Sequence, residues 1–235
     1  MRTPLNGVMG MLELLGQHLA GEQGQRYLDA ATESAERLFQ LVTRLLDLVE
    51  LDSGSFTTTR TTVDVAVLAE TVRERWQMEA LRGGYLLTVM TQGQDQCWID
   101  EPRVVQILNE LIDNVLTHAS PGAVRIELRS YEEGFLASVS DSGPGIDPEL
   151  IPGLMSSDLT MLDDSTARTA QGLGLGLGIC RRIAEAVGGT LELESDGEKR
   201  STATLAMPTN SARSDQSGVA NVDSGRCQEQ VASHD

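Results

Sequence analysis

Three groups of residues in this chain have the types and spacing that suit binding of a phosphorylated nucleotide. They are two polar residues one helical turn apart, a carboxylate followed by two glycines, and a run of alternate glycines: Glu110, Asn114, Asp141, Gly143, Gly145, Gly172, Gly174 and Gly176. A buried carboxylate such as Asp141 can accept a hydrogen bond from an adenine amino group, and the glycines beside it let the backbone pass close to the base. The amide oxygen of Asn114 suits Mg²⁺ that also binds phosphate. The alternate glycines offer N–H groups to phosphate oxygens at a helix N-terminus. Together these residues predict a nucleotide pocket.

Alternating helix and strand signals predict the elements that must carry these residues. Helices are expected over residues 65–79, 101–119 and within 170–187, and strands over 85–91, 96–99, 124–131, 135–141, 190–194 and 202–207. Asn114 then lies on the second helix, Asp141 ends the second strand of a hairpin, and the glycine run opens the third helix. Strands gathered against helices on one face indicate an α/β sandwich.

The first 54 residues carry two apolar stripes at helical spacing. The first consists of Leu5, Val8, Leu12, Leu15 and Leu19, and the second of Leu28, Ala31, Ala35, Leu38, Val42, Leu45 and Val49. Residues 21–24 supply a turn between them. Further leucines make the second stripe too wide for one partner helix, so we favour a dimeric four-helix bundle. The alternative is a helical arm packed on its own neighbouring domain.

Composition limits the classes of partner. The net charge is −17 and the pI is near 4.5, which argues against binding of nucleic acid or anionic membranes, since both need a basic surface. No stretch reaches the roughly 18 apolar residues of a membrane span. Cys97, Cys180 and Cys227 lack metal or disulfide spacing and suggest a reducing compartment.

As a set, the motifs resemble those of the bacterial sensor histidine kinases of the hybrid type. Residues 2–15, Arg-Thr-Pro-Leu-Asn-Gly-Val-Met-Gly-Met-Leu-Glu-Leu-Leu, are similar to the sequence after the phosphoacceptor histidine in the family's dimerisation hairpin. Residues 98–103 are similar to the turn before its asparagine box, which holds Glu110 and Asn114. The two glycine boxes match the residues around Asp141 and the alternate glycines. Residues 197–202 are similar to the closing loop.

The resemblance covers residues 1 to about 208 and implies an α+β fold. It divides the chain into a dimerisation hairpin that lacks its start (1–54), a threonine-rich connector (55–62), a Bergerat-type α/β sandwich that binds ATP (63–208), and a tail or linker without order (209–235). The sandwich is the ATP-binding fold shared with gyrase and MutL-type ATPases.

The resemblance also implies roles for single residues. Glu110 and Asn114 would be catalytic, with Asn114 as the Mg²⁺ ligand. ATP would be contacted by Asn114, Asp141, Gly143, Gly145, Arg168, Gly172, Gly174, Gly176 and Thr202. Glu110 stands where many of these kinases have asparagine and the gyrase branch has a general base; it would orient water, bind Mg²⁺ through water, or be a surface carboxylate. Thr117 replaces a lysine that often contacts phosphate, and the lid over 152–171 lacks phenylalanine.

The phosphoacceptor is expected just upstream of Met1. None of the three histidines, His18, His118 and His234, is expected to replace it. The implied reaction is transfer of the γ-phosphoryl group of ATP to a histidine, followed by relay to a receiver aspartate. The implied partners are a second copy of the chain and a response-regulator receiver domain, with no nucleic acid and no membrane contact. The expected location is the cytoplasm, or the cytoplasmic part of an inner-membrane sensor.

Two alternatives of other kinds remain at this point. One is an ATP-binding or ATP-hydrolysing switch of the gyrase type, in which Glu110 is the base. The other is a non-catalytic dimerisation module that sequesters kinases or receivers through residues 1–54.

Overall fold

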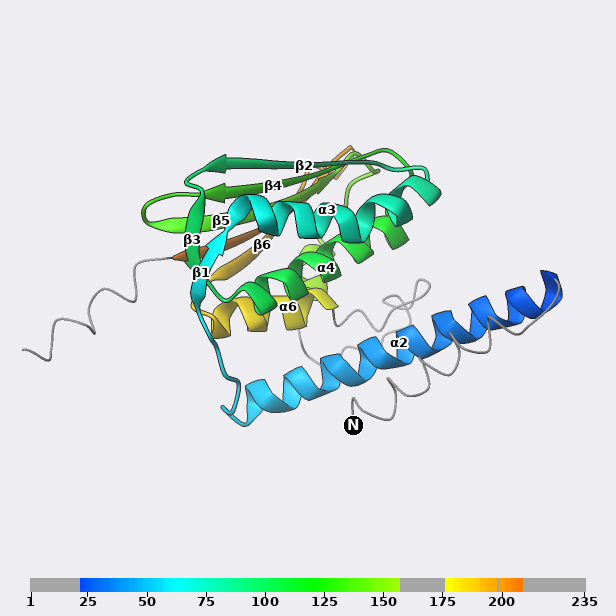
Figure 1. Cartoon of the computed structure of the whole chain (residues 1–235), viewed down its shortest axis with the longest axis horizontal. Helices are drawn as coiled ribbons and strands as arrows, with labels where there is room; N and C mark the ends of the chain where they lie inside the picture. The colour runs from blue at the N-terminus through cyan, green and yellow to red at the C-terminus, as the bar shows by residue number, and fades with distance from the viewer. Residues whose placement is uncertain (1–21, 157–175, 198, 209–235) are drawn as a thin grey trace, which may run out of the picture.

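A five-stranded mixed sheet is covered on one face by helices, and one further helix lies beyond them (Figure 1). The computed structural model describes residues 22–156, 176–197 and 199–208. Its helices are α2 (Glu22–Asp52), α3 (Val65–Arg82), α4 (Glu101–His118), α5 (Ile151–Leu154) and α6 (Gly176–Ala186). Its strands are β1 (Thr61–Asp64), β2 (Leu86–Gly93), β3 (Gln96–Ile99), β4 (Ala123–Ser130), β5 (Gly134–Asp141), β6 (Thr190–Ser195) and β7 (Ser201–Pro208).

The sheet has the order β2-β4-β5-β7-β6, so β5 lies at its centre. Only the β2–β4 pair is parallel among these strands, and β4 and β5 form the predicted antiparallel hairpin. Alternate residues face the helices because side chains alternate along a strand. On β5 these are Phe135, Ala137 and Val139, each at most 2% exposed. Asp141 continues the same alternation and therefore faces the helix side where the strand ends.

Two aspartates fix where the helices on the sheet begin. Asp64 accepts hydrogen bonds from the backbone N–H of Ala66 and Val67 at the start of α3. Asp100 accepts one from the backbone N–H of Arg103 at the start of α4 and a second from Thr59, at 2.6 Å. Such caps satisfy N–H groups that the first turn leaves without partners. The cap on α4 sets the position of the predicted asparagine-box residues.

α2 packs along α4 and α6 on the side away from the sheet (Figure 1). Asp47 of α2 is 1% exposed and accepts a hydrogen bond from Gln106 at 2.6 Å, with Arg103 at 3.4 Å. Asp52 forms an ion pair with Arg182 of α6 at 2.5 Å. The buried carboxylate of Asp47 needs its partners, because an unpaired buried charge is costly. The interface between α2 and the sheet-bound helices therefore combines apolar packing at Leu48 with specific polar contacts.

The other side of α2 leaves large apolar side chains exposed. These are Tyr27, Leu38, Leu45 and Val49, each more than half exposed. Among the described helices, none has the length and apolar character to cross a membrane.

The expectations for the sheet domain match the structure, with differences at the N-terminal side. Strand 96–99 is confirmed at its bounds, and the other predicted strands and helices end within a few residues of β2, β4–β7, α3, α4 and α6. The turn over 21–24 is wrong within the described residues, because α2 begins at Glu22 and includes Gly24. Thr61 and Thr62 of the expected connector instead form β1, paired antiparallel with β3. The first predicted helix lies outside the described residues.

Candidate functional site

A cavity of about 860 Å³ opens between α4, the end of β5, the start of α6 and the facing side of α2. Of the residues predicted from the sequence, it is lined by Glu110, Asn114, Asp141, Gly145 and Gly176. These come from three separate parts of the chain. The fold therefore brings together the asparagine box, the first glycine box and the start of the helix that follows the glycine run.

Asn114 is held at the cavity wall by the packing of α4. The helix buries Val104, Ile107, Leu108 and Leu111 against the sheet, which leaves the face with Glu110 and Asn114 for the cavity. The side-chain nitrogen of Asn114 is buried and has no hydrogen-bond partner among the described residues. Rotating the amide by 180° places its oxygen there instead, and an oxygen without a protein partner is what a shared Mg²⁺ would bind.

Asp141 lies half-buried at the end of β5, where the chain leaves the sheet. Its Oδ1 accepts a hydrogen bond from the N–H of Gly143 at 2.7 Å, which leaves Oδ2 for a ligand. Burial raises the pKa of Asp141 above its ordinary value, and the Gly143 N–H opposes part of that rise. A Cβ at residue 143 would lie 2.6 Å from Oδ1, so this close approach requires glycine.

Gly176 starts α6 directly against Glu110. A Cβ on residue 176 would lie 2.0 Å from Oε1 of Glu110, so only glycine lets the carboxylate reach this helix end. The same oxygen accepts a hydrogen bond from the Arg44 guanidinium of α2 at 2.5 Å. Sequence reasoning missed Arg44, which is 66 residues away from Glu110 along the chain. No local pattern in the sequence could have suggested this pair.

Two of the remaining predicted residues, Thr202 and Gly143, do not line the cavity. Thr202 does not line it, because the alternation of β7 turns Ser201 and Ala203 toward the cavity and Thr202 to the other face of the sheet. There its hydroxyl pairs with Ser140 at 3.0 Å. Thr202 therefore does not face this cavity, whereas Ser201 does. Gly143 does not line the cavity, but its N–H donates to Asp141 and orients that carboxylate. Arg168, Gly172 and Gly174 lie outside the described residues.

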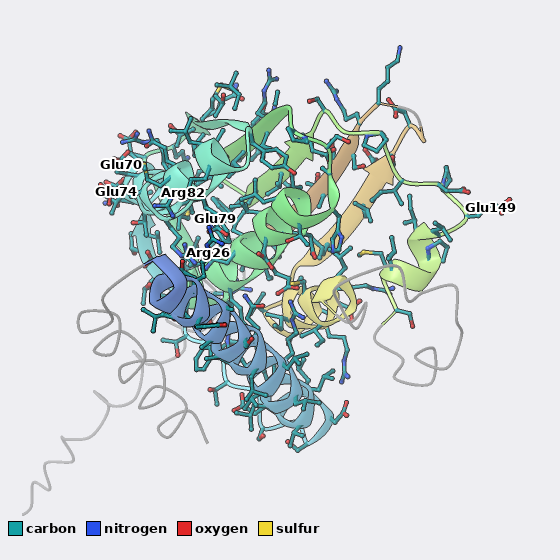
Figure 2. All side chains as sticks on the ribbon, turned by 90° about the vertical axis from the view of Figure 1, so that its right-hand side faces the viewer. Arg26, Glu70, Glu74, Glu79, Arg82 and Glu149 are labelled. Atoms are coloured by element: carbon teal, nitrogen blue, oxygen red, sulfur yellow. The ribbon has the colours of Figure 1, made fainter. Side chains whose placement is uncertain are left out.

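Residues of α3 form the outer wall. Glu79 and Arg82 line the cavity and lie on the α2 side of α3, whereas Glu70 and Glu74 lie on its outer surface and Glu149 lies far from them, beside α5 (Figure 2). Trp76 donates its indole N–H to Asn109 at 2.8 Å, which ties α3 to α4 next to the asparagine box. This wall was not predicted, because apolar and charged positions of α3 follow no pattern specific to a pocket.

Two family descriptions match the chain. Residues 1–54 match the "His Kinase A (phospho-acceptor) domain", and residues 99–211 match the "Histidine kinase-, DNA gyrase B-, and HSP90-like ATPase". The virulence sensor protein BvgS of Bordetella pertussis is 32% identical over 201 residues, which is 83% of this chain and 16% of that protein. The circadian input-output histidine kinase CikA of Synechococcus elongatus is 31% identical over 216 residues, 88% of this chain and 28% of that protein. The chain therefore spans less than a third of either relative.

Solved structures share the fold. ShkA, solved full-length in complex with AMPPNP, superposes with a TM-score of 0.70 at 26% identity, over 88% of this chain and 43% of that chain. The Acinetobacter baumannii histidine kinase AdeS superposes with a TM-score of 0.62 over 88% of this chain and 94% of that chain, and at 21% identity this likeness concerns the fold alone. With both domain types matched in sequence and this cavity at the expected motifs, the chain carries the two domains of a sensor histidine kinase and is homologous to the hybrid sensor kinases.

Proposed function

We propose that this chain binds Mg-ATP in the cavity and donates the γ-phosphoryl group to a histidine, for relay to the aspartate of a response-regulator receiver. The observation that carries the proposal is the convergence of Asn114, Asp141 and Gly176 on one cavity. Asp141 Oδ2 would accept from the adenine amino group, and the start of α6, with Gly172 and Gly174 before it, would hold the phosphates. Arg168 would contact the γ-phosphate.

The residues present fit Mg²⁺. Mg²⁺ usually takes one or two protein oxygens and completes its shell with phosphate and water. Asn114 would supply the direct ligand and Glu110 a ligand through water. The ion would neutralise charge on the phosphates, and the chain's own residues would orient them.

Labelled ATP tests this proposal. We expect the chain extended by Ser-His-Glu ahead of Met1 to incorporate γ-label in an acid-labile, base-stable form, as a phosphohistidine does. The chain without the extension should remain unlabelled. Label on both proteins would show that another residue is the acceptor, and label on neither would contradict the kinase proposal. Transfer from the labelled protein to a receiver domain then tests the relay.

The gyrase-type alternative is less well supported by the site. A general base must be free to take a proton or orient water, and Glu110 is held by the Arg44 guanidinium. Steady release of phosphate without labelling of the extended chain would favour that alternative. The non-catalytic module would be favoured if an Asn114→Ala protein still altered partner kinases or receivers as the wild type does.

We also propose that α2 belongs to a homodimer interface and that the protein acts in the cytoplasm, where ATP is available. The exposed apolar side of α2 supports a partner helix. We expect Leu38→Glu with Leu45→Glu to convert a dimer into monomers, since the bundle would bury unpaired charge. Both side chains are about half exposed in this structure, so the monomer should stay folded. Light scattering after size-exclusion chromatography measures the mass, and an unchanged dimer in the double variant would contradict the interface.

A further inference from the structure

Within the described part of the chain, four basic side chains line the cavity, and they are not equivalent. They are Arg44, Arg75, Arg82 and His118. Arg75 stacks on the Trp76 ring at 4.6 Å, pairs with Glu79 at 3.5 Å and is largely exposed. Arg82 and His118 lie exposed at the last turns of α3 and α4. Arg44 is different, because only 19% of its side chain is exposed.

Arg44 also lies at the point where a terminal phosphate would be expected. Its guanidinium bonds the Glu110 oxygen that approaches the first residue of α6. The N-terminus of that helix is the part of the site best suited to an anion. The Nε of Arg44 is buried, and no acceptor for it lies among the described residues. A buried donor of this kind is costly unless it binds an acceptor.

We infer that Arg44 is a phosphate-binding residue, supplied to the ATP cavity by the dimerisation helix. This inference deepens the proposed function and rests on it. One side of the guanidinium holds Glu110 in place, and the Nε side donates to an oxygen of the terminal phosphate. Thr117, on the cavity wall near the end of α4, contributes no charge there, whereas the Arg44 guanidinium brings a positive charge to the Glu110 side of the cavity. The ATP site is then built from both domains.

The contact predicts selectivity among nucleotides. Because the terminal phosphate of ATP is absent from ADP, Arg44→Ala should weaken ATP binding about tenfold, as for a hydrogen bond to a charged group, and leave ADP affinity within about twofold. Calorimetric titration with AMPPNP and ADP, each with Mg²⁺, measures both affinities. Arg44→Gln keeps an N–H donor near the position of Nε and most of the aliphatic side chain but removes the charge, so we expect it to lower ATP affinity as well. Thermal unfolding checks that each variant is folded.

Two further variants separate this role from an indirect one. If Arg44 acted only by neutralising Glu110, then Arg44→Ala would cost no further ATP affinity in a Glu110→Gln background; we expect the loss of about tenfold to remain there. Arg182→Ala removes another ion pair between α2 and the sheet-bound helices but lies outside the cavity lining, so we expect unchanged affinities. The role of Arg44 would be overturned by equal losses for AMPPNP and ADP, by no loss, or by no further loss in the Glu110→Gln background, and each of these results would leave ATP binding intact. A wild type that binds neither nucleotide would overturn the proposed function with it.

Discussion

Asn114→Ala is expected to abolish label transfer from ATP in the protein extended by Ser-His-Glu. The variant removes the one direct Mg²⁺ ligand proposed for the site, so the ion and the γ-phosphate lose their alignment with the acceptor. Loss of one oriented group that stabilises charge in a transition state typically costs about 100-fold or more. Initial rates of incorporation of γ-label, compared at saturating Mg-ATP, measure the effect.

The same helix offers a matched control. Asn109 is also an asparagine of α4, but its side chain accepts the indole N–H of Trp76 and does not line the cavity. Asn109→Ala should reduce the free energy of unfolding, since it leaves the indole N–H of the buried Trp76 without its acceptor, and should keep the labelling rate within a few-fold. Equal rate losses in the two variants would mean that Asn114 acts through the stability of α4 and not through the metal.

Asp141→Asn is expected to have opposite effects on ligand binding and on stability. The Gly143 N–H requires an acceptor, so the new amide must turn its oxygen toward Gly143 and its NH₂ group toward the ligand. The NH₂ group would then face the adenine amino group, and because both groups are donors, no hydrogen bond could form between them. We expect ATP affinity to fall by about 1–3 kcal/mol, roughly tenfold to hundredfold, by calorimetric titration. Equal affinities would contradict the assignment of Asp141 to adenine.

The raised pKa of Asp141 sets the pH dependence. Since its folded-state pKa lies above the ordinary value, the folded protein binds this proton more tightly than the unfolded chain. Its contribution to stability is therefore complete below the ordinary pKa and is lost as the pH rises through the folded-state pKa. At neutral pH the nucleotide-free Asp141→Asn protein should be more stable than wild type in urea. The ATP affinity of wild type should fall as the pH drops through the raised pKa, and that dependence should be absent in the variant.

Much of the sheet domain could be predicted because its strands alternate and its helices are capped. The hairpin of β4 and β5 follows from the strict alternation of apolar and polar residues and from a predicted turn around residues 133–134, which ends where β5 begins at Gly134. β1 was missed because Val63 is its only apolar residue, and its pairing with β3 depends on a partner far along the chain. Gly24 was taken as a turn residue, but neighbours with high helix propensity carry α2 through it, since one glycine costs only about 1 kcal/mol.

The site was predictable only where it follows motifs. Asp141, Asn114 and Gly176 are grouped as their spacing indicated. Thr202 could have been placed correctly, because Ala203, Leu205 and Met207 are the apolar positions of its strand and alternation turns Thr202 away from them. The contact of Arg44 with Glu110 was beyond sequence reasoning, since it depends on how α2 packs against α4 and no local pattern encodes that angle.

The burial of Asp47 has a mechanical consequence. A carboxylate that is 1% exposed and bound to Arg103 and Gln106 cannot separate from them gradually, because partial separation leaves a buried charge without partners. One turn along α2, about 5.4 Å away, Thr43 and Leu51 carry no charge, whereas Glu50, three residues after Asp47, pairs with Arg103 at 3.9 Å. The contacts of Asp47 and Glu50 with α4 therefore fix where α2 lies along that helix. Any twist or push on α2 would reach the cavity through these contacts, and a change of register would be a step between discrete arrangements.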